Sequence, residues 1–108
     1  SGAEIAVVSP PAFLATKLEA FLGRGRGDYA SSHDLEDFVS VVDGRGGIVE
    51  EVSASSDDLR SFLSIELERF LTDERFLSAL PGHLPSDSGS QARVPILLKR
   101  LRALAGTG

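Results

Sequence analysis

The sequence predicts a mainly α-helical fold, with one short N-terminal β-strand followed by about five helices in a compact bundle. Over most of the chain, apolar residues recur at the three- and four-residue spacing of amphipathic helices. Most of these stretches lie between a capping Ser or Thr and a Gly- or Pro-containing turn, which are typical start and stop signals. With 108 residues and 42% hydrophobic content, we expect residues 1–108 to form a single domain.

Residues 4–9, EIAVVS, predict the strand, because they are rich in β-branched residues and end at a pair of prolines. One strand cannot form a sheet alone. It is therefore an edge strand, pairs with a second copy in a homodimer, or joins a sheet whose other strands lie outside this sequence. Ser9 and the prolines predict the start of the first helix, which runs to about Leu22 and ends in a loop of alternating Gly and Arg over residues 23–27.

The middle of the chain contains three further helical patterns. Ser31 or Ser32 predicts the start of the second helix, which Gly44 ends. Residues 48–54 favour a short helix. Two serines and two aspartates then predict a long helix that runs to about Leu71. Apolar residues cover more than half of its circumference, so we expect this helix to be the core of the fold, in contact on two sides.

Two more helices are predicted in the C-terminal third. A short one, DERFLSAL, follows Thr72 as its cap and closes at Pro81 and Gly82. After a polar loop, a last helix carries apolar residues from Val94 to Leu104, and Pro95 either starts or kinks it.

Composition excludes several classes of function. There is no cysteine, which rules out disulfides, thiolate metal sites and cysteine catalysis. The formal net charge of -5 argues against nonspecific nucleic-acid binding, although Lys99, Arg100 and Arg102 form a local basic patch.

No apolar run predicts a membrane span or a signal peptide, so we expect a cytoplasmic protein without a membrane partner. Because the sequence lacks methionine and begins Ser-Gly-Ala, we interpret it as a processed or cut chain, with residues 1–3 a flexible or cloning-derived start.

Four ionisable residues lie at or beside positions where helix periodicity predicts apolar ones. Lys17 falls inside the apolar sector of the first helix, and Arg24 extends the same line. Asp34 lies among the apolar positions of the second helix and Asp37 on their border. If the two helices pack face to face, these charges meet at one seam, where Lys17 either extends its stem to water or pairs with an anion.

Other candidates have simpler structural explanations. His33 and His83 lack the spacing of zinc ligands, and the loop GRGRGDY matches neither common phosphate-binding fingerprint. Glu4 is a poor candidate for a metal ligand, and we expect no metal site. Asp34 in a first helical turn is also expected for dipole reasons, and Asp37 as a solvent-edge carboxylate.

The pattern Lys17-x-x-Ala20-x-x-x-Arg24, followed by His33-Asp34-x-x-Asp37, resembles the downstream half of the AbiEii-type nucleotidyltransferases, a bacterial family that includes toxins of toxin-antitoxin systems. The runs SPPAFLATKLEAF and SHDLEDFVSVVDGR are very similar to runs in family proteins, so the resemblance covers most of residues 4–43. It implies that this chain is the C-terminal part of an enzyme that transfers a nucleotide from an NTP to an acceptor with Mg²⁺.

The resemblance also implies roles for single residues. Lys17 would contact the triphosphate, Arg24 would lie near the phosphates, and Asp34 and Asp37 would support the active site or the acceptor. His33 replaces a basic residue of the family. An antitoxin is an implied partner.

The family's metal site has no counterpart in this sequence. It needs a Gly-Ser turn followed by a D-x-D pair on a strand, but Gly89-Ser90 is followed by Gln91, Ala92 and Arg93. We therefore expect the chain to be inactive alone and to need a partner chain or a missing N-terminal half. The alternative is a non-enzymatic helical protein-interaction domain in which Lys17 and Asp34 form a structural ion pair. A third hypothesis is nucleic-acid contact through the local basic patch.

Overall fold

The computed structural model describes residues 8–24 and 27–108, and all regular structure in this part of the chain is helical. The elements are α1 (Pro10–Arg24), α2 (His33–Gly44), α3 (Ile48–Ser53), α4 (Asp57–Leu71), α5 (Glu74–Ala79), the 3-10 helix η1 (Leu80–His83), α6 (Ser88–Gln91) and α7 (Val94–Ala105). The predicted boundaries of the longer helices are confirmed to within a few residues. The polar loop, however, contains η1 and α6, which the sequence pattern did not indicate.

The prediction of an N-terminal strand over residues 4–9 is wrong, because the described residues contain no strand and no sheet. Residues 4–7 lie outside the described residues. At Ser9 the backbone serves the helix instead: its carbonyl accepts a hydrogen bond from Phe13 N at 2.8 Å, and its hydroxyl accepts one from Ala12 N at 3.3 Å. Val8 is 58% exposed and packs in no sheet.

Local capping explains where most of the helices begin. The Ser32 hydroxyl accepts a hydrogen bond from Leu35 N at the start of α2. The Ser56 hydroxyl accepts one from Leu59 N at the start of α4. The prediction that Thr72 caps α5 is wrong. The N-cap is the next residue, Asp73, whose carboxylate accepts a hydrogen bond from the backbone N–H of Arg75. Pro95 lies in the first turn of α7, where its missing N–H leaves no bond unmade, and so it starts this helix.

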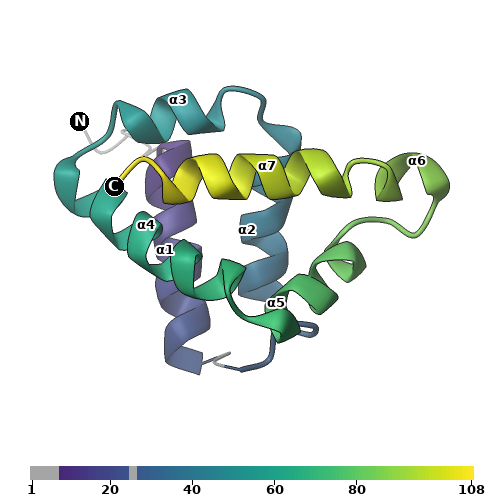
Figure 1. The fold of residues 1–108 in the computed structure, drawn as a ribbon. Helices are drawn as coiled ribbons and strands as arrows, with labels where there is room; N and C mark the ends of the chain where they lie inside the picture. The colour runs from purple at the N-terminus through teal and green to yellow at the C-terminus, as the bar shows by residue number, and fades with distance from the viewer. Residues whose placement is uncertain (1–7, 25–26) are drawn as a thin grey trace, which may run out of the picture.

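The helices form two crossed layers (Figure 1). In one layer α1 and α2 lie side by side. In the other, α4 and α7 cross in front of them, while α3 closes one end. Helix α4 contacts α1, α3, α5 and α7, which confirms the prediction that it is in contact on two sides. Ser64 on α4 is buried and donates its hydroxyl to the Ala105 carbonyl on α7. The residues that fill the interior are mainly apolar and include Leu14, Leu18, Phe38, Val39, Leu63, Leu67, Leu97 and Leu101.

A group of four aromatic rings closes the end of the core where α4 meets α5. Phe21, Tyr29, Phe70 and Phe76 have ring centroids 5.1 to 5.8 Å apart, mostly edge to face. Tyr29 lies in the loop before α2, so its contacts with Phe70 on α4 and Phe76 on α5 hold that loop against these two helices.

Substitutions at two neighbouring residues of α7, one buried and one exposed, test which face of this helix packs in the core. Leu97 is fully buried and Ile96 is 51% exposed. Leu97→Ala is expected to lower the free energy of unfolding by about 2 to 5 kcal/mol, because it leaves a cavity between the layers. Ile96→Ala, the matched control, is expected to change it by less than about 0.5 kcal/mol. Urea denaturation followed by circular dichroism measures both, and equal effects would contradict this placement of α7.

Candidate functional site

The candidate site is the exposed side of the seam between α1 and α2. The two helices run antiparallel, because the later residue on α1 pairs with the earlier residue on α2: Lys17 pairs with Asp37, and Arg24 pairs with Asp34. The four residues that the sequence singled out therefore come together. We call them the charged cluster: Lys17, Arg24, Asp34 and Asp37.

Asp34 is the centre of the charged cluster. Its two carboxylate oxygens accept hydrogen bonds from Nε and Nη2 of Arg24, each at 3.0 Å, in the bidentate geometry that suits a guanidinium. The ammonium of Lys17 lies 3.7 Å from the same carboxylate and 2.7 Å from that of Asp37. Lys17 therefore bridges both aspartates.

The cations are more accessible than the carboxylate between them. The side chain of Asp34 is 11% exposed, that of Lys17 is 25% exposed and that of Arg24 is 74% exposed. The Lys17 ammonium also lies 5.5 Å from the centroid of the Phe13 ring, a cation–π contact. The cluster thus presents the Arg24 guanidinium and the Asp37 carboxylate to solvent, the latter on a side chain that is 48% exposed, while the Asp34 carboxylate is largely covered.

These contacts shift the ionisation of three members. The hydrogen bonds from Arg24, with the nearby positive charges, lower the pKa of Asp34 below its ordinary value, although burial opposes this. The hydrogen bond to Asp37 is the largest cause of the raised pKa of Lys17. The pKa of Arg24 is raised by its hydrogen bond to Asp34. All three groups are therefore held in their charged forms at neutral pH.

The charged cluster does not suit a Mg²⁺ ion. Both oxygens of Asp34 already accept from Arg24, and Asp37 holds the Lys17 ammonium, so a divalent ion would meet two adjacent cations. Within residues 8–24 and 27–108, no group of three or more His, Asp or Glu side chains is arranged to hold a metal. The remaining candidate ligand, Glu4, lies outside the described residues.

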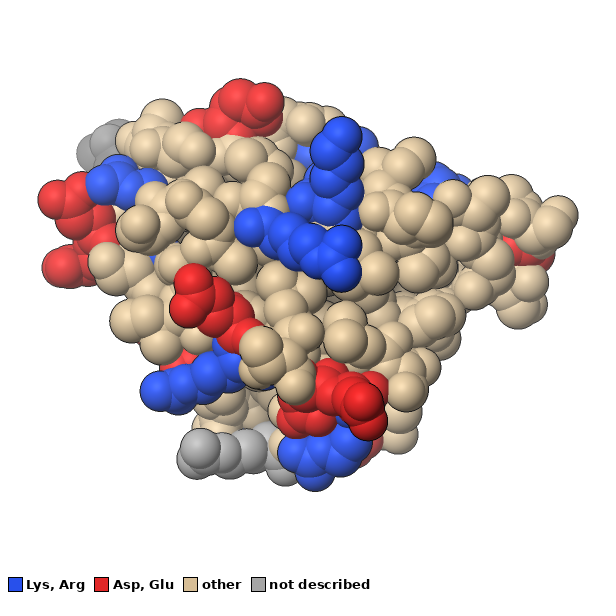
Figure 2. All heavy atoms as spheres, viewed as in Figure 1, with Lys and Arg blue, Asp and Glu red and all other residues tan. Residues whose placement is uncertain are grey.

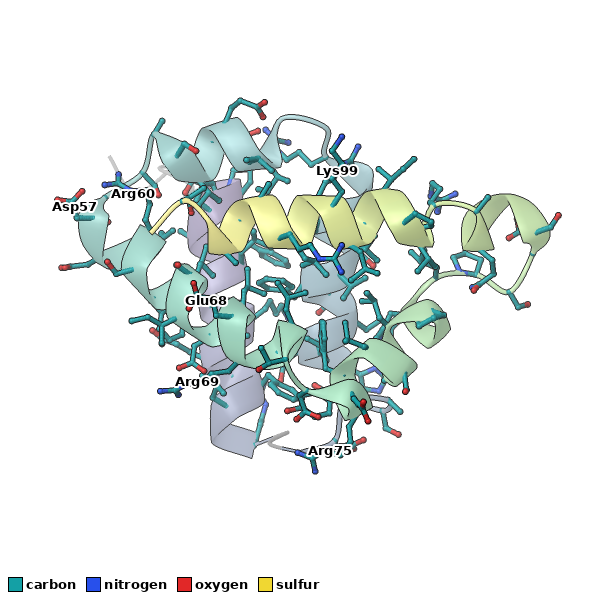
Figure 3. All side chains as sticks on the ribbon, in the orientation of Figure 1. Asp57, Arg60, Glu68, Arg69, Arg75 and Lys99 are labelled. Atoms are coloured by element: carbon teal, nitrogen blue, oxygen red, sulfur yellow. The ribbon has the colours of Figure 1, made fainter. Side chains whose placement is uncertain are left out.

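The basic patch near the C-terminus is divided between two surfaces. Lys99 projects outward from α7 (Figure 3), and Lys and Arg side chains lie over this helix on the face shown in Figure 2. Arg100 points inward, and its Nη1 donates to the backbone carbonyls of Val42 and Asp43 at the end of α2. It compensates the negative end of that helix, and so does not extend the patch formed by Lys99 and Arg102.

The two histidines have structural partners. His33 is exposed at the start of α2, with Nδ1 3.5 Å from the carboxylate of Glu36. Nε2 of His83 donates to the carbonyl of Tyr29 at 2.6 Å, which ties η1 to the loop before α2. Neither histidine belongs to the charged cluster.

Two ion pairs near helix ends were not predicted from the sequence. Asp43 and Arg93, fifty residues apart, form a bidentate pair at 3.0 and 3.1 Å that joins the end of α2 to the start of α7. Asp73 accepts from Arg75 and from the Tyr29 hydroxyl, and these bonds lower the pKa of Asp73 to about 2. The Asp43–Arg93 pair has no local signal. The capping signal at Asp73 was present, directly after Thr72.

Comparison of the chain with family models, with curated proteins and with solved structures finds no match in any of the three. Among the described helices, none has the length and apolar character needed to cross a membrane.

The charged cluster predicts a dependence of stability on acid. Because the pKa of Asp34 is lower in the folded state than its unfolded value of about 3.9, its stabilising effect is complete above that value and is lost as the pH falls through the folded pKa. Asp34→Asn is expected to lower stability at pH 7 and to flatten this part of the acid transition. Thermal unfolding measured from pH 7 downward tests this.

Asp73→Asn removes a different carboxylate of lowered pKa and leaves the charged cluster intact, so it is expected to flatten the acid transition independently of Asp34→Asn. An Asp34→Asn variant with the same acid transition and the same stability as the unchanged chain would show that the pair with Arg24 contributes nothing.

Proposed function

We propose that this chain is the C-terminal helical part of an AbiEii-like nucleotidyltransferase, and that its charged cluster binds the phosphates of a nucleoside triphosphate. One observation carries the proposal. The four residues to which the family resemblance assigns phosphate contact and active-site support lie together on one exposed seam between α1 and α2. Two of these residues lie on α1 and two on α2. Helical periodicity predicts the face of each helix on which they lie, but not that all four come into contact.

The geometry suits a preorganised phosphate site. Asp34 holds the guanidinium of Arg24 by one edge, and within the described residues the Nη1 group on the other edge makes no hydrogen bond. Lys17 uses one of its three donors on Asp37. The aspartates thus fix the two cations while leaving donors for phosphate oxygens, which is the supporting role that the resemblance implies.

Catalysis requires more than this chain provides. Since the charged cluster does not suit Mg²⁺, the metal-binding carboxylates would come from a partner chain or from a further segment of the protein. We propose that the 108 residues alone bind nucleotide weakly and do not turn over. The intact enzyme would act in the cytoplasm, with an antitoxin as a candidate partner.

A second candidate function is a non-enzymatic protein-interaction domain. The observation that favours it is the internal balance of the charged cluster, in which two cations meet two carboxylates. In this hypothesis the cluster only fixes the packing of α1 on α2, and its cations bind no ligand.

Titration with ATP, CTP, GTP and UTP, each with Mg²⁺, tests the proposal by NMR. Amide shifts are expected at Lys17, Arg24 and the first turn of α2. Lys17→Ala is expected to weaken binding about tenfold or more, because a charge-assisted contact to phosphate is lost. Lys99→Ala removes an exposed lysine from α7 and is expected to leave binding unchanged. Absence of shifts at millimolar nucleotide would contradict the nucleotide proposal.

A double-mutant cycle separates the two candidates. Arg24→Ala, Asp34→Ala and the double variant are compared by urea denaturation and by nucleotide titration. Under the nucleotidyltransferase proposal, Arg24→Ala weakens nucleotide binding in addition to any loss of stability. If the cycle gives a stabilising coupling while the unchanged chain binds no nucleotide, the charged cluster is structural and the interaction-domain hypothesis is favoured.

A further inference from the structure

A shallow, open pocket of about 390 Å³ lies beside the charged cluster, between the start of α1 and the end of α2. Its volume is within the range of small-molecule sites, roughly 300 to 1,000 Å³. Most of its lining is apolar, and Ser40 and Arg45 contribute polar side chains. The lining residues are Val8, Pro10, Phe13, Ser40, Val41, Gly44 and Arg45.

Phe13 joins the pocket to the charged cluster. Its ring lines the pocket and also lies under the Lys17 ammonium, 5.5 Å from the ring centroid. The two residues are one helical turn apart on α1. A ligand that occupies the pocket therefore reaches the first cation without leaving the protein surface.

Because α1 and α2 are antiparallel, the pocket and the residues of the charged cluster follow one another along the seam between them. Phe13 and Val41 flank the pocket, Lys17 and Asp37 follow, and Arg24 with Asp34 comes last. The Lys17 ammonium lies 5.5 Å from the Phe13 ring centroid and 3.7 Å from Asp34 Oδ1, and Arg24 Nη2 donates to that oxygen at 3.0 Å, so the ring and the guanidinium lie within about 12 Å of each other. A nucleoside triphosphate is long enough to span this distance.

We propose that this pocket receives the base of the nucleoside triphosphate whose phosphates lie along Lys17 and Arg24. This inference rests on the proposed function and deepens it. A nucleobase has flat apolar faces and polar edges, so it can stack on the Phe13 ring while its edge meets the Ser40 hydroxyl and the backbone at Gly44. Apolar walls with a few polar groups at the rim suit that chemistry.

The test compares ligands with and without a base. The full chain is titrated with each of the four nucleoside triphosphates and with inorganic triphosphate, each with Mg²⁺, and amide shifts are followed by NMR. The nucleoside triphosphates are expected to shift Phe13, Ser40 and Val41 together with the charged cluster. Inorganic triphosphate is expected to shift the charged cluster alone.

Variants then separate the base from the phosphates. Phe13→Leu keeps an apolar side chain but removes the ring, and is expected to weaken binding of the preferred nucleotide about fivefold or more, with binding of inorganic triphosphate unchanged. Phe62→Leu changes a partly buried ring on α4 and is the matched control. Ser40→Phe, at an exposed position, fills the pocket without disturbing the core and is expected to have the same effect as Phe13→Leu.

The outcomes distinguish this inference from the function on which it rests. If the nucleotides and inorganic triphosphate bind equally, and neither pocket variant changes nucleotide binding, the base pocket is overturned while the phosphate site stands. If neither class of ligand shifts the charged cluster, the proposed function fails and the base pocket fails with it.

Discussion

The apolar packing of α1 on α2, through buried residues such as Leu14, Leu18 and Phe38, is the interaction on which the rest of the fold depends. The bidentate pair between Asp34 and Arg24 lies at its edge. A carboxylate that is largely covered costs free energy unless its charge is compensated and its oxygens accept hydrogen bonds. The guanidinium does both, and the position of Asp34 in the first turn of α2 adds the favourable field of the helix dipole. Lys17 joins Asp37 on the same seam, so two ion pairs connect α1 and α2 in the layer on which α4 and α7 pack.

The same physical arrangement recurs at the edges of the fold. Asp43 receives a guanidinium from Arg93, and Asp73 receives one from Arg75 together with the Tyr29 hydroxyl. In each case a carboxylate next to a helix end is held by an arginine fork, while the interior between the layers stays apolar. The apolar core supplies most of the stabilisation, and the forks determine how the ends of the helices meet.

The charged cluster differs from the other pairs in its composition. It joins two cations to two carboxylates, and one of the cations lies over the Phe13 ring that lines the pocket. Under the nucleotide proposal, a phosphate would compete with the carboxylates for donors that are already oriented, so ligand binding and helix packing would draw on the same groups. This sharing would explain why a site can look like a structural ion pair while still suiting an anionic ligand.

The sequence by itself determined the longer helices and the residues of the charged cluster. Caps such as Ser32 and Ser56 act within one helical turn, and a charge at an apolar position is visible in the periodicity of its own helix. Only the tertiary structure decided the rest. Residues 8 and 9 lead into the cap of α1 where a strand was predicted, and α6 is tied to the preceding loop by bonds from the Gln91 side chain. Which charge pairs with which, and whether a pocket opens beside them, depends on the register of two helices. That register is set by contacts between residues far apart in the chain, which local patterns do not encode.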